Sequence, residues 1–132
     1  MRRRFPRSFA LLVATLVAVP AAQAADKACL VEGSFTLGNE STPTRGCTEN
    51  TGLPPAAFKE MCEGGVKMAS GLPGAKPAKL TYSAACPAKA QGVCHGLFGQ
   101  PLSGYYYDLD AEWLARTRKV CEAKGGKFKL NP

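Results

Sequence analysis

The chain has 132 residues, of which 45% are hydrophobic and 20% are charged, and its formal net charge is +7. This length allows one domain with a modest core. Four of the basic residues are arginines within the first 24 residues, so the rest of the chain has a net charge of only +3. That small excess argues against a nucleic-acid-binding protein, because such proteins carry a strongly basic surface.

Residues 1–24 have the three parts of a cleavable signal peptide. A basic stretch over 1–7 precedes an apolar run over 10–19, and residues 22–24 form an A-x-A cleavage site. The apolar run is too short for a stable transmembrane span, and no later segment is long and apolar enough to form one. We therefore expect a periplasmic or secreted product, and the short Arg-led signal favours a bacterial source. General secretion and twin-arginine export stay open as routes.

All six cysteines follow the signal peptide, and we predict that they form three disulfides. An even number of cysteines in a short exported chain is typical of a disulfide framework, with each bridge contributing about 2–4 kcal/mol. The spacing selects no pairing, although a local bridge from Cys29 to Cys47 would close the N-terminal arm. With no C-x-x-C motif and a single histidine, the sequence predicts no metal site, no cofactor and no redox-active pair. The six are Cys29, Cys47, Cys62, Cys86, Cys94 and Cys121.

Residues 25–53 are expected to form an N-terminal arm, and residues 54–132 a cysteine-rich region that makes a single domain with it. The arm has an alternating stretch at 34–37 that predicts a strand, followed by a polar, Gly- and Pro-containing loop over 39–52. A short helix is predicted from 55 to about 63, because its apolar residues recur at helical spacing and proline suits the first turn.

The pair Gly64-Gly65 is expected to end this first helix and to lead into a strand that begins at 66–68. A loop rich in Gly and Pro follows over 69–78. Clean alternation predicts a strand over 79–84, and a further strand is expected over 92–98. The aromatic run 105–107 also favours a strand.

The best-defined element is a helix over about 111–124. Asp110 is a suitable N-cap residue, and apolar residues recur at helical spacing up to Cys121. Gly125-Gly126 stops this helix, and 127–130 alternates as a final strand. We therefore predict an α+β fold, in which two helices, at about 55–63 and 111–124, lie on a small, mainly antiparallel sheet stapled by disulfides.

Two segments of the chain echo each other. Residues 58–68 and 120–130 both contain Cys-Glu followed by a glycine pair and a lysine. The echo predicts one device used twice, in which a helical cysteine anchors the helix and the glycines turn the chain into the sheet. The broader pattern C…GG…CP…GxC…C…GG, over about 58–130, resembles small cysteine-rich exported bacterial proteins of uncharacterised function. The resemblance implies disulfide staples and no activity.

No catalytic arrangement is predicted. His95 lacks an obvious partner and is expected to be a structural or surface residue. A Ser-His-Asp arrangement would have to use Ser83 or Ser103 with Asp108 or Asp110, but no nucleophile-elbow motif is present. The acidic cluster around residues 108–112 departs from a calcium-binding loop and is better explained as helix capping.

The leading functional prediction is a non-enzymatic binding module of the cell envelope. Its partner would be an envelope protein or an anionic envelope polymer, because residues 64–107 contain lysines and no acidic residue. The alternative is an inhibitor of an extracellular hydrolase such as lysozyme. Residues 103–107 match S-G-x-x-Y, a motif similar to one in periplasmic lysozyme inhibitors, which implies that Ser103 and Tyr107, with Tyr105 between them, contact the partner.

Overall fold

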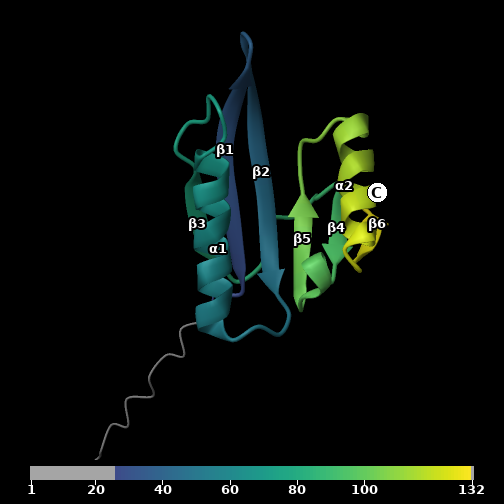
Figure 1. Cartoon of the computed structure of the whole chain (residues 1–132). Helices are drawn as coiled ribbons and strands as arrows, with labels where there is room; N and C mark the ends of the chain where they lie inside the picture. Colours follow the sequence, from purple (N-terminus) through teal and green to yellow (C-terminus); the bar gives the residue numbers. More distant parts are fainter. Residues whose placement is uncertain (1–25, 132) are drawn as a thin grey trace, which may run out of the picture.

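Six antiparallel strands form one sheet in the order β3-β1-β2-β5-β4-β6, and two helices pack on it, which confirms the predicted α+β class (Figure 1). The structure is a computed structural model that describes residues 26–131, so the predicted signal peptide lies outside it. No helix within that range is long and apolar enough to cross a membrane. The elements are β1 (Ala28–Leu37), β2 (Glu40–Asn50), α1 (Pro55–Ser70), β3 (Lys79–Ser83), β4 (Gly92–His95), the 3-10 helix η1 (Leu97–Gly99), β5 (Leu102–Tyr106), α2 (Ala111–Ala123) and β6 (Lys127–Leu130).

The N-terminal arm is a long β-hairpin, so the loop predicted over 39–52 is wrong. β1 and β2 pair along their whole length, and their register leaves only Gly38 and Asn39 in the turn. Gly38 has φ +61°, which a two-residue hairpin turn requires and glycine adopts without strain. Most side chains of β2 are polar and its outer half is exposed, so the sequence lacks the apolar alternation that predicts a strand.

The first helix is longer than predicted, because α1 continues through Gly64-Gly65 to Ser70. The strand expected at 66–68 is therefore also wrong, since those residues are helical. Packing on β1 and β3 outweighs the low helix propensity of the two glycines. The chain leaves the helix at Gly71, and the Ser70 hydroxyl then accepts a hydrogen bond from the Ala78 N–H just before β3.

The C-terminal elements follow the sequence closely. Strands at 79–83 and 127–130 and a helix at 111–123 match the predictions to within one residue, and the backbone N–H of Trp113 donates to the Asp110 carboxylate at the N-cap. The strand predicted over 92–98 ends early, at His95. Gly96, with φ +72°, turns the chain into η1 there.

The three disulfides are confirmed, but the Cys29–Cys47 pairing is wrong. The bridges are Cys29–Cys62, Cys47–Cys86 and Cys94–Cys121. Cys29 lies opposite Thr48 in the ladder, so the neighbouring Cys47 points to the other face of the sheet. Cys47 is buried there with Ala28, Ala90 and Tyr107, beneath the segment that joins β3 to β4.

The fold consists of two similar ββαβ halves related by an approximate twofold axis. In each half a strand pair is followed by a helix and by a third strand that pairs with the first: β1-β2-α1-β3, then β4-β5-α2-β6. The halves join through β2 and β5, where Thr48 faces Gly104. One row across the sheet therefore reads the same from both edges: aromatic, half-cystine, small, small, half-cystine, aromatic. Its members are Tyr82, Cys29, Thr48, Gly104, Cys94 and Phe128.

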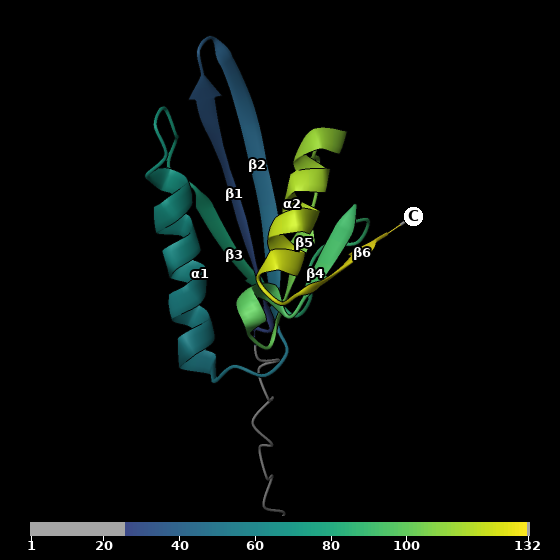
Figure 2. The same ribbon diagram turned by 45° about the vertical axis from the view of Figure 1, so that its right-hand side comes forward.

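Each helix is held to its own half by an equivalent disulfide. Cys29 of β1 binds Cys62 of α1, and Cys94 of β4 binds Cys121 of α2. The predicted echo is thus right about the two helical cysteines. It is wrong about the glycines, because only Gly125-Gly126 leads directly into a strand. Since Cys29 and Cys94 share a row, both helices lie on the same face of the sheet (Figure 2).

Candidate functional site

A groove lies between the two helices, over the strands at which the halves meet. α1 packs on β1 and β3, and α2 packs on β4 and β6, so neither helix covers the centre of the sheet. Two hollows lie along this region and share Tyr106, Trp113 and Thr117 in their linings. We refer to both together as the interhelical groove, and to its parts as the α2 hollow and the hairpin hollow.

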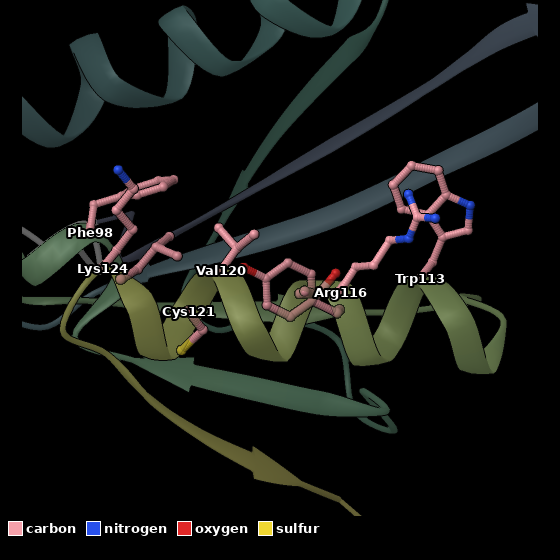
Figure 3. A pocket seen from close by; sticks show the side chains of 9 residues that line it. Phe98, Trp113, Arg116, Val120, Cys121 and Lys124 are labelled. Atoms are coloured by element: carbon pink, nitrogen blue, oxygen red, sulfur yellow. The ribbon is translucent and has the colours of Figure 1, made fainter.

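The α2 hollow, of about 260 Å³, gathers large apolar side chains that are exposed to solvent. Phe98 is 61% exposed, Trp113 is 50% exposed and Val120 is 54% exposed. Their side chains point to the same side of α2, whereas Cys121 points away from them (Figure 3). Clustered exposure of this kind marks binding surfaces, whereas single exposed apolar residues are ordinary. The lining is Leu97, Phe98, Tyr106, Trp113, Arg116, Thr117, Val120, Cys121 and Lys124.

Comparison of the two halves explains why the α2 hollow is empty of side chains. Phe58 lies four residues before Cys62 and is only 3% exposed in the core of the first half. The equivalent residue, four before Cys121, is Thr117, which lines the hollow. A threonine therefore stands where the other half places a phenyl ring against the sheet.

The same comparison shows that the cations around the α2 hollow have no counterpart in the first half. Arg116 and Lys124 correspond to Ala57 and Gly65 when the helices are aligned on their disulfides. Arg116 lies over the Trp113 ring, 5.4 Å from its centroid, and pairs with Glu112 on the solvent side. Lys124 has no ion-pair partner among residues 26–131, and no acidic side chain lines the hollow.

The hairpin hollow, of about 610 Å³, borders an unpaired stretch of β2. β5 pairs with β2 only over 46–50, so residues 40–45 have one edge open. The Asn50 N–H donates to the Lys27 carbonyl on the β1 side. Because the backbone N–H groups of a strand point alternately to its two edges, the backbone nitrogen of Pro43 faces the open edge. Proline offers no N–H there, which is a common protection of edges against strand addition.

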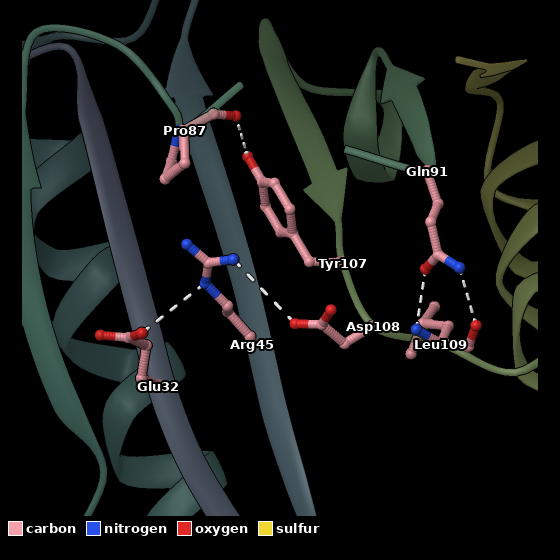
Figure 4. Close-up of polar contacts among 7 residues, drawn as sticks. All are labelled: Glu32, Arg45, Pro87, Gln91, Tyr107, Asp108 and Leu109. Carbon is pink, nitrogen blue, oxygen red and sulfur yellow. Dashed lines mark hydrogen bonds and ion pairs between the residues drawn. The ribbon is translucent and has the colours of Figure 1, made fainter. Parts of the chain in front are cut away.

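The predicted partner-binding residues lie on the opposite face of the sheet and are engaged within the chain. Ser103 and Tyr107 are buried, at 5% and 3% exposure, and Tyr105 is half-buried. The Tyr107 hydroxyl donates to the Pro87 carbonyl at 2.6 Å, and the Arg45 guanidinium lies 4.7 Å from its ring centroid (Figure 4). These contacts hold the segment that covers this face, and they leave Ser103 and Tyr107 little surface for a partner.

Ser103 and His95 form a side-chain pair across β5 and β4, with 3.1 Å between the hydroxyl and Nδ1. This is the spacing of a nucleophile and a base. The Ser103 hydroxyl is buried, and the acid opposite it in the sheet, Glu49, already accepts hydrogen bonds from the Cys86 N–H and the Tyr105 hydroxyl, so these groups do not complete such a site. Asp110 caps α2, and Asp108 lies 4.0 Å from Arg45. Within residues 26–131 no three His, Cys, Asp or Glu side chains gather as metal ligands would.

Tyr105 is expected to resist ionisation. Burial raises its pKa, and the Glu49 carboxylate, which accepts a hydrogen bond from the Tyr105 hydroxyl at 2.9 Å, raises it further, to about 12. Because the pKa of Tyr105 is higher in the folded protein than the ordinary value near 10, its protonated hydroxyl contributes to the free energy of unfolding below pH 10. This contribution is lost as the pH rises toward 12. In Glu49→Gln the pKa of Tyr105 should fall toward 10, read as tyrosinate absorbance during alkaline titration. Glu112→Gln is the control, and an unchanged titration in Glu49→Gln would contradict the assignment.

Sequence reasoning missed the interhelical groove, although one signal for it was available. Aligning the two helices on Cys62 and Cys121 sets Phe58 against Thr117, which shows an apolar position lost from an otherwise regular face. The identity of that face becomes clear only once both helices are known to lie on the same side of the sheet. No protein-family model, no curated protein and no solved structure matches this chain.

Proposed function

We propose that this protein is a non-enzymatic binding module of the bacterial cell envelope and that the interhelical groove is its binding surface. The observation that carries the proposal is the cluster of exposed Phe98, Trp113 and Val120 around a single hollow. Covering these side chains with a ligand removes apolar surface from water, at about 25 cal/mol for each Å². A groove of this kind, apolar with a few charged groups at its rim, is typical of ligand sites.

Export to the periplasm or outside the cell is part of this proposal. It rests on the signal-peptide pattern of residues 1–24 and on three disulfides, which persist in oxidising compartments. The resemblance to small cysteine-rich exported bacterial proteins agrees with it. The charge around the α2 hollow favours an anionic partner over a cationic one, because this hollow has Arg116 and Lys124 at its rim and no acid in its lining. The hairpin hollow, which is lined by three acidic side chains and Arg45, does not share this preference.

The proposal is tested with the single tryptophan of the chain, which lies in the groove. Lipid, glycan and protein fractions of a cell envelope are titrated into oxidised protein beginning at Ala25 while Trp113 emission is recorded. We expect at least one fraction to shift the emission of the wild type and to leave Val120→Asp unchanged. Leu72→Asp, at an exposed apolar residue outside both hollows, should respond like the wild type. If every fraction leaves the emission unchanged, the groove is not the binding surface.

Inhibition of an extracellular hydrolase stays the alternative proposal. It rests on the S-G-x-x-Y match at 103–107 alone, and the burial of Ser103 and Tyr107 gives it no geometric support. Undiminished lysozyme activity in the presence of a large excess of the oxidised protein would end this alternative for lysozyme.

A further inference from the structure

We propose that the α2 hollow binds a single-chain anionic amphiphile: an acyl chain that ends in an acidic group, as in a fatty acid or a lysolipid fragment. This inference rests on the proposed function and names the ligand class of the same site. The acyl chain would lie against Leu97, Tyr106 and Val120, and the acidic group would lie at the rim with either Arg116 or Lys124.

The place of the acyl chain follows from the comparison of the halves. In the first half the phenyl ring of Phe58 fills the space beside the helical disulfide, and in the second half Thr117 leaves it open. Packing defects of this kind are costly because the atoms around them lose contacts. An apolar guest restores those contacts, so the hollow should favour hydrocarbon over water.

The place of the acidic group follows from the charges at the rim. Lys124 and Arg116 are the charged side chains in the lining, and both replace small residues of the first half. Lys124 lies beside Phe98 at one end of the exposed apolar side chains, and Arg116 lies beside Trp113 at the other (Figure 3). An acidic group can therefore meet a cation at either end while its chain lies over Val120.

A hydrocarbon chain fits the lining better than a peptide does. A bound peptide brings backbone N–H and C=O groups that lose their water and need new partners. Besides the two cations and the Trp113 indole N–H, the side chains of the lining offer only the hydroxyls of Tyr106 and Thr117. The neighbouring hairpin hollow could have supplied backbone partners from β2, but Pro43 interrupts that edge.

The experiment compares decanoate, decanol and decyltrimethylammonium by Trp113 emission and by calorimetry, with the two ions below their micelle concentrations and decanol below its solubility limit. We expect decanoate to bind about threefold to tenfold more tightly than decanol, because each exposed cation adds a modest attraction. The ammonium compound should bind more weakly than decanol. Added salt should weaken the binding of decanoate and leave that of decanol unchanged. Longer carboxylates should bind more tightly, by up to about fourfold for each methylene that reaches the hairpin hollow.

Four variants separate the parts of the proposal. Thr117→Phe should fill the hollow, abolish decanoate binding and raise the melting temperature, because it restores the packing seen at Phe58. Lys124→Gln should reduce the preference for decanoate over decanol, and Lys129→Gln, on β6 and outside the lining, should not. Should Thr117→Phe fail to fold, Val120→Asp at an exposed position gives the same test of binding.

The outcomes distinguish this inference from the proposed function. Equal affinity for decanoate and decanol would overturn the anionic part, and undiminished binding in both Thr117→Phe and Val120→Asp would overturn the placement. If no decyl compound binds while an envelope protein or glycan fraction still shifts Trp113 emission, the amphiphile inference is wrong and the binding module stands. If neither binds, both fall.

Discussion

Reduction of the three disulfides is expected to unfold the protein under conditions in which the oxidised form stays folded. The bridges close loops with sequence separations of 33, 39 and 27 residues. Chain-entropy arguments give about 3.5–4 kcal/mol for each loop of this size, and typical domains have a net stability of only about 5–15 kcal/mol. The core is small and much of it is made of the half-cystines themselves, so little remains to hold the sheet once they are reduced.

Circular dichroism and limited proteolysis of oxidised and reduced protein at equal concentration measure this effect. The oxidised protein should melt in one cooperative transition, and the reduced protein should show no transition. Alkylated, reduced protein is the better comparison, because it cannot reoxidise during the measurement. A cooperative melt that survives alkylation would contradict the prediction and would mean that the apolar core alone specifies the fold.

Replacement of Gly126 by alanine is expected to destabilise the protein by about 1–3 kcal/mol, in the range of overpacked cores. A Cβ atom at this position would lie 2.7 Å from the Cys94 Sγ and 2.8 Å from the Cys121 Sγ. It would also lie 3.0 Å from the Cys121 carbonyl oxygen, to which the Gly126 N–H already donates. Neither the disulfide nor the backbone of α2 can move away easily, so β6 would have to shift instead.

Gly64→Ala is the matched control, and its effect should have the opposite sign. Gly64 lies within α1, and a Cβ atom there meets no atom within 4 Å. Alanine should therefore stabilise the helix by about 0.5–1 kcal/mol through its better propensity. Urea denaturation of the three proteins gives both values. A Gly126→Ala variant as stable as the wild type would show that the C-terminal strand tolerates displacement from the disulfide.

The parts of the fold that the sequence predicts are those in which local signals and packing agree. α2 has its Asp110 cap, one apolar face and a glycine stop, and the structure reproduces them. α1 shows the opposite case, since the contacts of the helix with β1 and β3 carry it through the pair that should have ended it. β2 was hidden for a related reason. Its outer half is polar on both faces, and its pairing with β1 is long-range information that composition does not carry.

The candidate site was not predicted from the sequence for a different reason. The sequence indicates a partner-binding motif at Ser103, Tyr105 and Tyr107. The register of β5 places these side chains on the face of the sheet that the 84–91 segment covers. The exposed residues of α2 read in the sequence as an ordinary amphipathic helix with a wide apolar face. Only the twofold relation between the halves reveals that one of the two helices leaves a space beside its disulfide.

The pairing of the cysteines has a consequence for how the chain acquires its bridges. In sequence order the native pairs join the first cysteine to the third, the second to the fourth and the fifth to the sixth. A chain that emerges with its N-terminus first exposes Cys29 and Cys47 together, before their true partners, and rapid oxidation would trap the wrong bridge. Correcting it requires a free thiolate to attack that bridge, a slow exchange without a catalyst. Oxidative folding of the N-terminal half should therefore depend on a disulfide isomerase, whereas Cys94 and Cys121 can close directly.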